Sequence, residues 1–208
     1  GRPSEKIRAN YMMGCVYRDR GDSPRALQSY LNAVALADTT SAHCDFASIS
    51  RIYAQMGGIL HQQQYYQREL TVWQTAASLA YKANDTLMLA NCLQYMAGAY
   101  YDMHDSLHVM SCTVKARDLY LNAGHKDLAA AVNGMFIDHY LARGEFDKLK
   151  ENIDEYIHVS GLVDSDGNAY NGNEMIYYYL GVYYQQTNQL DSALWCFRKV
   201  LSLTSHLL

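Results

Sequence analysis

Three residues of this chain have the types and spacing of zinc ligands. His104, His108 and Cys112 are four residues apart, so on one continuous helix they would share a face and could bind a metal ion together. The repeat pattern described below, however, places a turn at Asp105, which separates His104 from the other two. The sequence therefore predicts no metal site here.

A second segment resembles part of a calcium-binding loop. Residues 164–168 read Asp-Ser-Asp-Gly-Asn, but with Gly167 as the turn glycine the first and last ligand positions fall on Leu162 and Asn173. We therefore interpret the segment as a solvated loop. No Ser/His/Asp or Cys/His arrangement with a positioning residue is present either. We expect a protein without cofactor or metal that is not an enzyme.

The composition is that of a helical protein. The chain has 208 residues, of which 50% are apolar and only two are proline, a combination that favours an all-α fold with a large core. Its net charge is −4 with Lys and Arg scattered, which argues against nucleic-acid binding by this segment. No apolar run reaches the roughly 20 residues of a membrane span. The five cysteines form no CxxC pair, and we interpret them as small core or groove residues.

The stretch from Tyr177 to Val200 has the spacing of two helices folded against each other. Gly181 and Ala193 are small residues where two backbones can cross closely, and Asn188 between them tolerates the left-handed conformation of a turn. The large apolar residues recur every three or four positions and are assigned to the core: Tyr177, Leu180, Tyr184 and Phe197. This pattern resembles the tetratricopeptide repeat (TPR).

The same template fits residues near the N-terminus almost as well. Gly14 and Ala26 take the two small positions, Tyr30 the aromatic position and Gly21 the turn. Asp22 is expected to cap the second helix, with Pro24 in its first turn.

Three weaker copies lie between these two. In the second copy we place Ser50 at the glycine position, the turn at Gly57 and Gln62 at the crossing position of a helix that continues to about Lys82. Asn84 and Asp85 are expected to cap the next helix. In the third copy Gly98 and Tyr101 take the glycine and tyrosine positions, with the turn at Asp105 and a helix end at Gly124. In the fourth copy these positions fall on Ile137, Tyr140 and Gly144.

The resemblance implies an all-α, right-handed α-α superhelix of about five helix pairs. We expect a single TPR solenoid domain over residues 1–208, with repeats at approximately 7–40, 43–83, 86–124, 126–160 and 172–207. In TPR proteins the first helix of each pair lines a concave face that binds a protein or peptide.

In this register three tyrosines take the same concave-face position. Tyr11, Tyr95 and Tyr178 would offer rigid amphipathic contact surfaces for a partner; the alternative is that they pack helix against helix. The remaining predicted partner-binding residues on this face are Arg18, Arg51, Gln55, Asp102, Asp138 and Gln185. The Lys and Asn residues with which some TPR proteins clamp a C-terminal carboxylate have no counterpart here, which argues against that ligand.

We therefore predict a non-enzymatic TPR scaffold that holds a protein or peptide on its concave face. Residues 14–27 and the Ala-Asp-Thr-Thr run at 37–40 also resemble the TPR regions of bacterial membrane-anchored proteins. That resemblance implies an alternative, an extracytoplasmic sensory input domain (periplasmic or lipoprotein-anchored), with a cytoplasmic location as the other option. This segment itself is expected to make no membrane contact, so an anchor would lie outside it.

Overall fold

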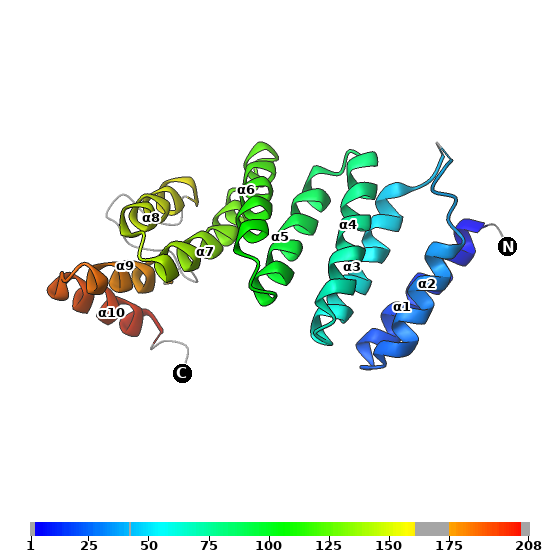
Figure 1. Cartoon of the computed structure of the whole chain (residues 1–208). Helices are drawn as coiled ribbons and strands as arrows, with labels where there is room; N and C mark the ends of the chain where they lie inside the picture. Colours follow the sequence, from blue (N-terminus) through cyan, green and yellow to red (C-terminus); the bar gives the residue numbers. More distant parts are fainter. Residues whose placement is uncertain (1–2, 42, 161–174, 205–208) are drawn as a thin grey trace. The chain divides into compact units, whose positions relative to one another are not determined.

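A computed structural model describes residues 3–41, 43–160 and 175–204, and all regular structure in these ranges is helical (Figure 1). Short turns join consecutive helices in pairs, so the prediction of an all-α fold with five helix pairs is confirmed. No helix in the described ranges has the length and apolar character needed to cross a membrane. The helices are α1 (Pro3–Asp19), α2 (Ser23–Ala35), α3 (Phe46–Gln62), α4 (Tyr66–Lys82), α5 (Thr86–Asp102), α6 (Ser106–Asn122), α7 (Lys126–Arg143), α8 (Phe146–Ser160), α9 (Met175–Gln186) and α10 (Leu190–Thr204).

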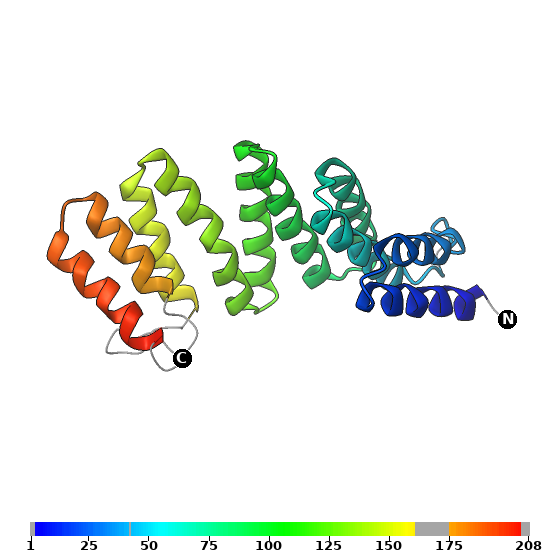
Figure 2. The same cartoon turned by 90° about the horizontal axis from the view of Figure 1, so that it is seen from below.

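The helices gather into two compact units, an N-terminal unit (Gly1–Leu119) and a C-terminal unit (Tyr120–Leu208). Within the N-terminal unit, α3 packs against both α2 and α4, and α5 packs against α4. Within the C-terminal unit, α8 packs against α7 and α9, and α9 packs against α10. Figure 2 shows the helices of each pair lying side by side with a tight turn between them. Each unit is thus a stack of helix pairs.

One left-handed residue ends the first helix of every pair. These residues are Gly21, Gln64, His104, Gly144 and Asn188, with φ between 60° and 77°. The predicted turns at Gly21, Gly144 and Asn188 are confirmed. We call the residue seven positions earlier the crossing position of each pair, because it faces the second helix where the two backbones approach: Gly14, Gly57, Ala97, Ile137 and Gly181.

In three pairs the crossing position is a glycine that lies directly under an aromatic ring. The ring belongs to the second helix and comes sixteen residues later in the chain. A Cβ atom added to Gly14 would lie 2.4 Å from Tyr30, one on Gly57 2.5 Å from Trp73, and one on Gly181 2.6 Å from Phe197. Real Cβ atoms do not approach other atoms so closely, so only glycine allows the ring to rest on the backbone.

The structure corrects the predicted register of the second repeat. Gly57 is a buried residue in the middle of α3 and not a turn, because Trp73 of α4 occupies the space beside it. Gln62 is the exposed last residue of α3, so the prediction that it replaces the crossing alanine is wrong. Ser50, predicted at the glycine position, is buried and donates a hydrogen bond to the Ala76 carbonyl oxygen at 2.8 Å.

The third repeat is shifted by one residue from its prediction. Ala97, fully buried, takes the crossing position, while Gly98 is half-buried with open space where a side chain would be. The facing residue of α6 is Thr113, also fully buried. Because Thr is smaller than an aromatic residue, an alanine at the crossing position leaves enough room for it. The prediction that Gly98 takes this position is therefore wrong.

The predicted helix caps are confirmed in the structure. Asp22 accepts a hydrogen bond from the Arg25 N–H at 3.2 Å, with Pro24 in the first turn of α2. Asp85 caps α5 in the same way, because it accepts a hydrogen bond from the Met88 N–H at 3.0 Å.

The cysteines are at least partly buried. Cys92, Cys112 and Cys196 are buried and the other two are half-buried, as expected for core and groove residues.

Adjacent glycines in α3 allow a matched test of the crossing contact. Gly57→Ala should destabilise the protein by about 1–3 kcal/mol, because the new methyl group would overlap Trp73. Gly58→Ala, one residue later with nothing within 4 Å, should instead stabilise it by about 0.5–1 kcal/mol through helix propensity. Urea unfolding followed by circular dichroism measures both, and equal effects of the two substitutions would contradict the assigned contact.

Candidate functional site

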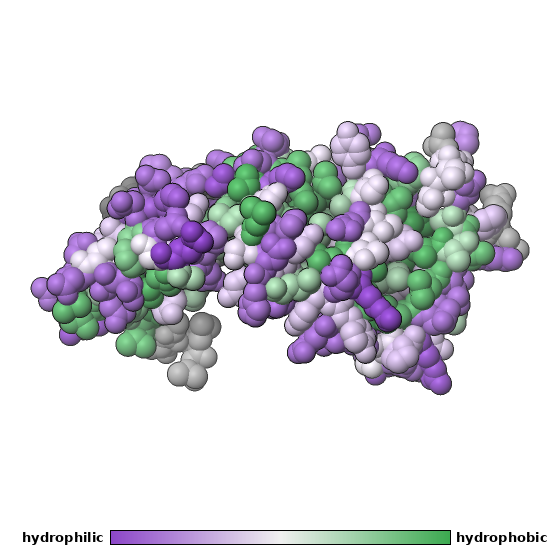
Figure 3. Space-filling view, in the orientation of Figure 1, coloured by the Kyte–Doolittle hydropathy of each residue, from purple (hydrophilic) through white to green (hydrophobic). Residues whose placement is uncertain are grey.

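A groove of about 780 Å³ lies in the N-terminal unit between α1 and α3. Its floor is apolar, with Ile49 and Ile52 of α3 buried and Ile7 of α1 half-buried. Residues 36–41 and 43–45, which follow α2, line one side, and Asp45 among them caps α3. We call this space the α1–α3 groove. On the face of the unit that Figure 3 shows, apolar residues also come to the surface among polar ones.

Tyr11 and Arg51, two of the residues predicted from the sequence, both line the α1–α3 groove. The Tyr11 ring is half-buried and lies against the ring of Tyr30, with centroids 6.0 Å apart. Burial, together with a hydrogen bond to Cys15, raises the pKa of the Tyr11 phenol. Tyr11 therefore remains a neutral hydroxyl group at physiological pH and can both donate and accept hydrogen bonds.

The rim of the groove carries two arginines that make few ion pairs within the protein. Arg51 is exposed and reaches Asp85 only at 3.5 Å, and Arg8 makes no ion pair among the described residues. The carboxylates on the rim, in contrast, accept hydrogen bonds from residues close to them in the sequence. Asp38 accepts hydrogen bonds from the Thr40 hydroxyl at 2.6 Å and N–H at 3.0 Å, and Asp45 accepts the equivalent pair from Ser48. These bonds lower the pKa of both carboxyl groups. The cations are thus more available to a ligand than the anions.

Three other predicted residues connect neighbouring first helices. Arg18 of α1 donates a hydrogen bond to the Gln55 side-chain oxygen of α3 and forms a 2.8 Å ion pair with Asp19. Asp102 of α5 lies 3.9 Å from Nδ1 of His61 on α3. These side chains therefore lie along one face formed by α1, α3 and α5, where each polar group has a partner within the protein.

Tyr95 is not at the same repeat position as Tyr11. Because the third repeat is shifted by one residue, the equivalent of Tyr11 in α5 is Gln94, and Tyr95 instead stacks on Trp73 of α4 with centroids 4.6 Å apart and planes 8° from parallel. Half of its surface nevertheless remains exposed (54%). The shared position proposed for three tyrosines is therefore wrong for Tyr95 and correct for Tyr178, which precedes Gly181 as Tyr11 precedes Gly14.

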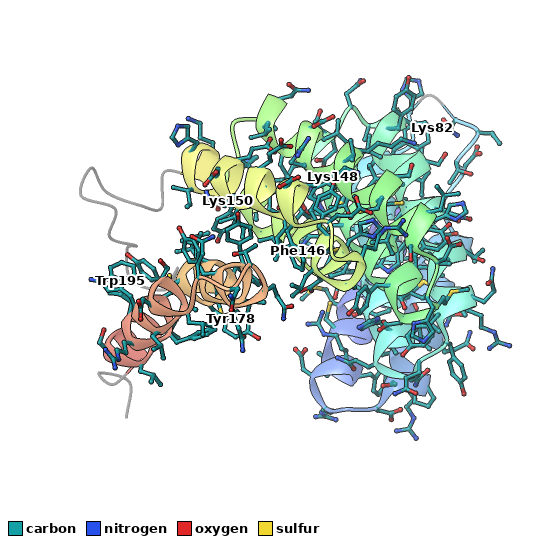
Figure 4. The ribbon with its side chains drawn as sticks, turned by 60° about the vertical axis from the view of Figure 1, so that its left-hand side comes forward. Lys82, Phe146, Lys148, Lys150, Tyr178 and Trp195 are labelled. Carbon is teal, nitrogen blue, oxygen red and sulfur yellow. The ribbon has the colours of Figure 1, made fainter. Side chains whose placement is uncertain are left out.

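The last three predicted residues belong to the C-terminal unit. Tyr178 lies on α9 (Figure 4) and is 44% exposed. Its ring contacts those of Tyr179 and Phe197. Asp138 of α7 is exposed, although the protein around it raises the pKa of its carboxyl group by desolvation. Gln185 near the end of α9 is also exposed.

Sequence reasoning missed residues that the structure brings to these surfaces. Arg8 on the groove rim belongs to no motif position, so no sequence signal identified it. His61 takes the repeat position of Arg18, four residues after the crossing position. With the correct register for α3, the sequence would have predicted His61 as a residue of this face. Tyr179 lies near Asp138, whose charge adds to burial in raising the pKa of the Tyr179 phenol.

The geometry separates the histidines of the first candidate metal segment. His104 lies in the turn with φ of 60°, while His108 in α6 pairs with Asp105 at 2.7 Å and stacks on Tyr100. Across the described ranges, no three His, Cys, Asp or Glu side chains gather as a metal would need. The Asp164–Asn168 segment lies outside the described residues.

A family model described as tetratricopeptide repeat matches residues 176–206. This segment is therefore similar in sequence to a tetratricopeptide repeat. It contains α9 except for its first residue, Met175, and all of α10, with the Gly181–Phe197 contact at its centre. No curated protein matches the chain.

Solved structures extend the TPR-like fold to the whole chain. BtubC (BKLC) from P. vanneervenii has a TM-score of 0.79 at 10% identity, over 99% of this chain and 89% of that chain. A Podosopora anserina protein of kinesin light chain type, with nearly identical TPR-like repeats, has a TM-score of 0.73 at 12% identity, over 99% and 98%. The Rap conjugation gene regulator of plasmid pLS20, in complex with the Phr* peptide, has a TM-score of 0.63 at 12% identity, over 97% and 54%. The predicted TPR-type solenoid fold is confirmed.

Glu69 has a buried carboxyl group that contacts the ring of His61. It is 1% exposed, accepts a hydrogen bond from Trp73 Nε1 at 3.1 Å and lies 3.2 Å from His61 Nδ1. Burial raises the pKa of Glu69, and the contacts with Trp73 and His61 lower it by less. The folded protein therefore holds the Glu69 proton more tightly than the unfolded chain does.

Replacing Glu69 by Gln should change how stability depends on pH. Because the folded-state pKa is raised above the ordinary value near 4.5, the stability contributed by this carboxyl group is fully present below that value and is lost as pH rises through the folded pKa. The free energy of unfolding of Glu69→Gln, relative to wild type, should therefore increase as pH rises from about 4 through the folded pKa of Glu69. Urea unfolding across this range measures it.

Glu145 provides a control of opposite sign. Lys148 and Arg143 lower its pKa to about 2, so stability from this carboxylate is present above the unfolded pKa and lost as pH falls. Glu145→Gln should thus lose stability relative to wild type as pH rises. A difference between Glu69→Gln and wild type that does not vary with pH would refute the assignment of a raised pKa.

Proposed function

We propose that this chain is a non-enzymatic scaffold that binds a peptide segment of a partner protein, and that the α1–α3 groove of its N-terminal unit is the binding site. The observation that carries the proposal is the convergence of Tyr11 and Arg51 on one apolar groove of about 780 Å³. That volume lies in the range of roughly 300–1,000 Å³ common for ligand pockets.

The lining favours a particular kind of peptide. The buried floor of Ile49 and Ile52 suits apolar side chains, and their burial would supply most of the binding free energy. The Tyr11 hydroxyl group can bond to peptide backbone, while Arg8 and Arg51 at the rim favour a carboxylate in the ligand. We therefore expect a segment with apolar residues next to an acidic one.

The structural neighbours are consistent with this role at the level of fold. The Rap regulator named above was solved with a bound peptide, so a protein of similar fold can hold one. Its identity to this chain is 12%, and no residue roles are transferred. The remaining sequence-predicted positions, including Tyr178 and Asp138, stay predictions for contacts with a partner.

The location of the protein also stays a prediction. An extracytoplasmic sensory domain would require a leader or anchor and an output segment in the same gene. Reading the complete gene tests this alternative directly, since a membrane span and an effector segment would favour it.

A library of random displayed peptides, panned on the purified protein, tests the groove. Peptides rich in apolar and acidic residues should be enriched. Their affinity for the Tyr11→Ala/Arg51→Ala double variant should fall at least tenfold, or about 1.4 kcal/mol, since both the Tyr11 hydroxyl group and the rim charge are removed. Fluorescence polarisation with an enriched peptide measures the affinity.

Tyr81→Ala serves as the matched control. Tyr81 is an exposed tyrosine (74%) that does not line the groove, so this variant should bind like wild type. Circular dichroism confirms that each variant is folded. Equal affinity of the double variant and wild type would rule out the α1–α3 groove as the site.

A further inference from the structure

The two arginines predicted to contact a partner differ in how far the protein itself occupies their guanidinium groups. All three nitrogens of Arg18 donate hydrogen bonds. Its Nε and Nη2 contact Asp19 at 3.0 and 2.8 Å, and its Nη1 donates to Gln55. Arg51 reaches Asp85 through Nη2 alone, at 3.5 Å. Since a guanidinium group has five N–H donors in a planar fork, Arg51 retains more of them for a second carboxylate than Arg18 does.

Asp85 contacts Arg51 with one carboxylate oxygen and caps α5 with the other. Its Oδ1 accepts a hydrogen bond from the Met88 N–H at 3.0 Å, while its Oδ2 contacts Arg51. Asp45 caps α3 in the same way, but there the residue three positions later is Ser48, whose hydroxyl group donates to Oδ2 at 2.6 Å. Methionine has no hydroxyl group, so at α5 the second oxygen is left to the arginine.

The charge of Arg51 acts on residues that line the α1–α3 groove. The hydrogen bonds from Ser48 lower the pKa of the Asp45 carboxyl group, and the charge of Arg51 lowers it further. Burial raises the pKa of the Tyr11 phenol, and the same charge opposes that rise. The guanidinium group is thus close to the groove, whereas Asp85 is not one of the residues that line it.

We propose that Asp85 competes with a bound peptide for Arg51. In the free protein the guanidinium group contacts Asp85, and in the complex the acidic residue of the peptide takes the place of Asp85. The Arg51 side chain is 61% exposed and the contact is long, so the ion pair is weak enough to be exchanged. A carboxylate that accepts two parallel hydrogen bonds from the fork forms a stronger contact.

The competition makes Asp85 a positioning residue that determines how strongly the groove prefers acidic peptides. A neutral peptide can bind while Arg51 keeps its contact with Asp85, but an acidic peptide must first displace Asp85. The presence of Asp85 therefore reduces what an acidic residue adds to the affinity. This inference rests on the proposed binding of a peptide in the α1–α3 groove.

Asp85→Asn tests the competition, because asparagine caps a helix as well as aspartate does but carries no charge. Fluorescence polarisation uses a peptide from the displayed library that contains one acidic residue. This peptide should bind Asp85→Asn about two- to fivefold more tightly than wild type, as expected when an exposed ion pair no longer has to be broken. The same peptide with the corresponding amide in place of its acidic residue should bind both proteins equally. Loss of a helix cap alone would not distinguish the two peptides.

Asp22→Asn is the matched control. Asp22 caps α2 as Asp85 caps α5, and its replacement changes the net charge by the same amount. It pairs with Arg25 at 3.3 Å and does not line the groove, so this variant should bind both peptides like wild type. In an Arg51→Ala background, Asp85→Asn should give no gain in affinity, since the cation for which Asp85 competes is absent. Circular dichroism confirms that each variant is folded.

Failure of this inference can be distinguished from failure of the proposed function. If the Tyr11→Ala/Arg51→Ala variant keeps wild-type affinity, the groove is not the binding site and both are overturned. If that variant loses affinity but Asp85→Asn binds the acidic peptide no better than wild type, only the competition is overturned. An equal gain for the acidic and the amide peptide, or a gain that persists without Arg51, would overturn it as well.

Discussion

The stack of helix pairs depends on how closely a second-helix side chain approaches the backbone of the first helix. Where the second helix supplies Tyr30, Trp73 or Phe197, the crossing position must be glycine, because a Cβ atom would lie within 2.4 to 2.6 Å of the ring. Where the second helix supplies Thr113, the crossing residue is Ala97. In these four pairs the volumes of the two facing residues therefore compensate for each other, as close packing in protein interiors requires.

The second pair shows how one large side chain determines several others. Trp73 fills the space over Gly57, but its indole N–H then needs an acceptor in the core. Glu69 supplies this acceptor at 3.1 Å, and it occupies the position where the first and last pairs have Ala26 and Ala193. The buried carboxyl group is in turn contacted by His61 at 3.2 Å, which also lies near Asp102 of α5. The packing of Trp73 inside the α3–α4 pair thus leads to a polar contact with α5 of the next pair.

The same stacking produces the surfaces to which we assign function. Since α1 and α3 are first helices of consecutive pairs, their N-terminal halves line the α1–α3 groove together with residues 36–41 and 43–45. Tyr11 can reach into it because its ring rests on Tyr30, the residue that also covers Gly14. Binding in the groove would therefore follow from the repeat itself.

The sequence alone determined the features that depend on neighbouring residues. Helix pairs, the caps at Asp22 and Asp85, and the turns at Gly21, Gly144 and Asn188 follow from local backbone preferences, and the predictions for them are correct. The best repeats could also be aligned, which correctly placed Tyr11 and Tyr178 at one position. The sequence could not align the second and third repeats, where Gly57 looked like a turn and Gly98 like a crossing residue.

Only the tertiary structure decided those cases, because the role of a glycine depends on the side chain that approaches it from another helix. Trp73 makes Gly57 a buried crossing residue, and Thr113 allows Ala97 to take that position in place of Gly98. A shift of one residue rotates the assigned positions by about 100° around the helix axis. Tyr95 therefore stacks on Trp73 and does not take the position predicted for it. The groove, too, needed the tertiary structure, since it joins α1 and α3 across a loop whose path no local pattern specifies.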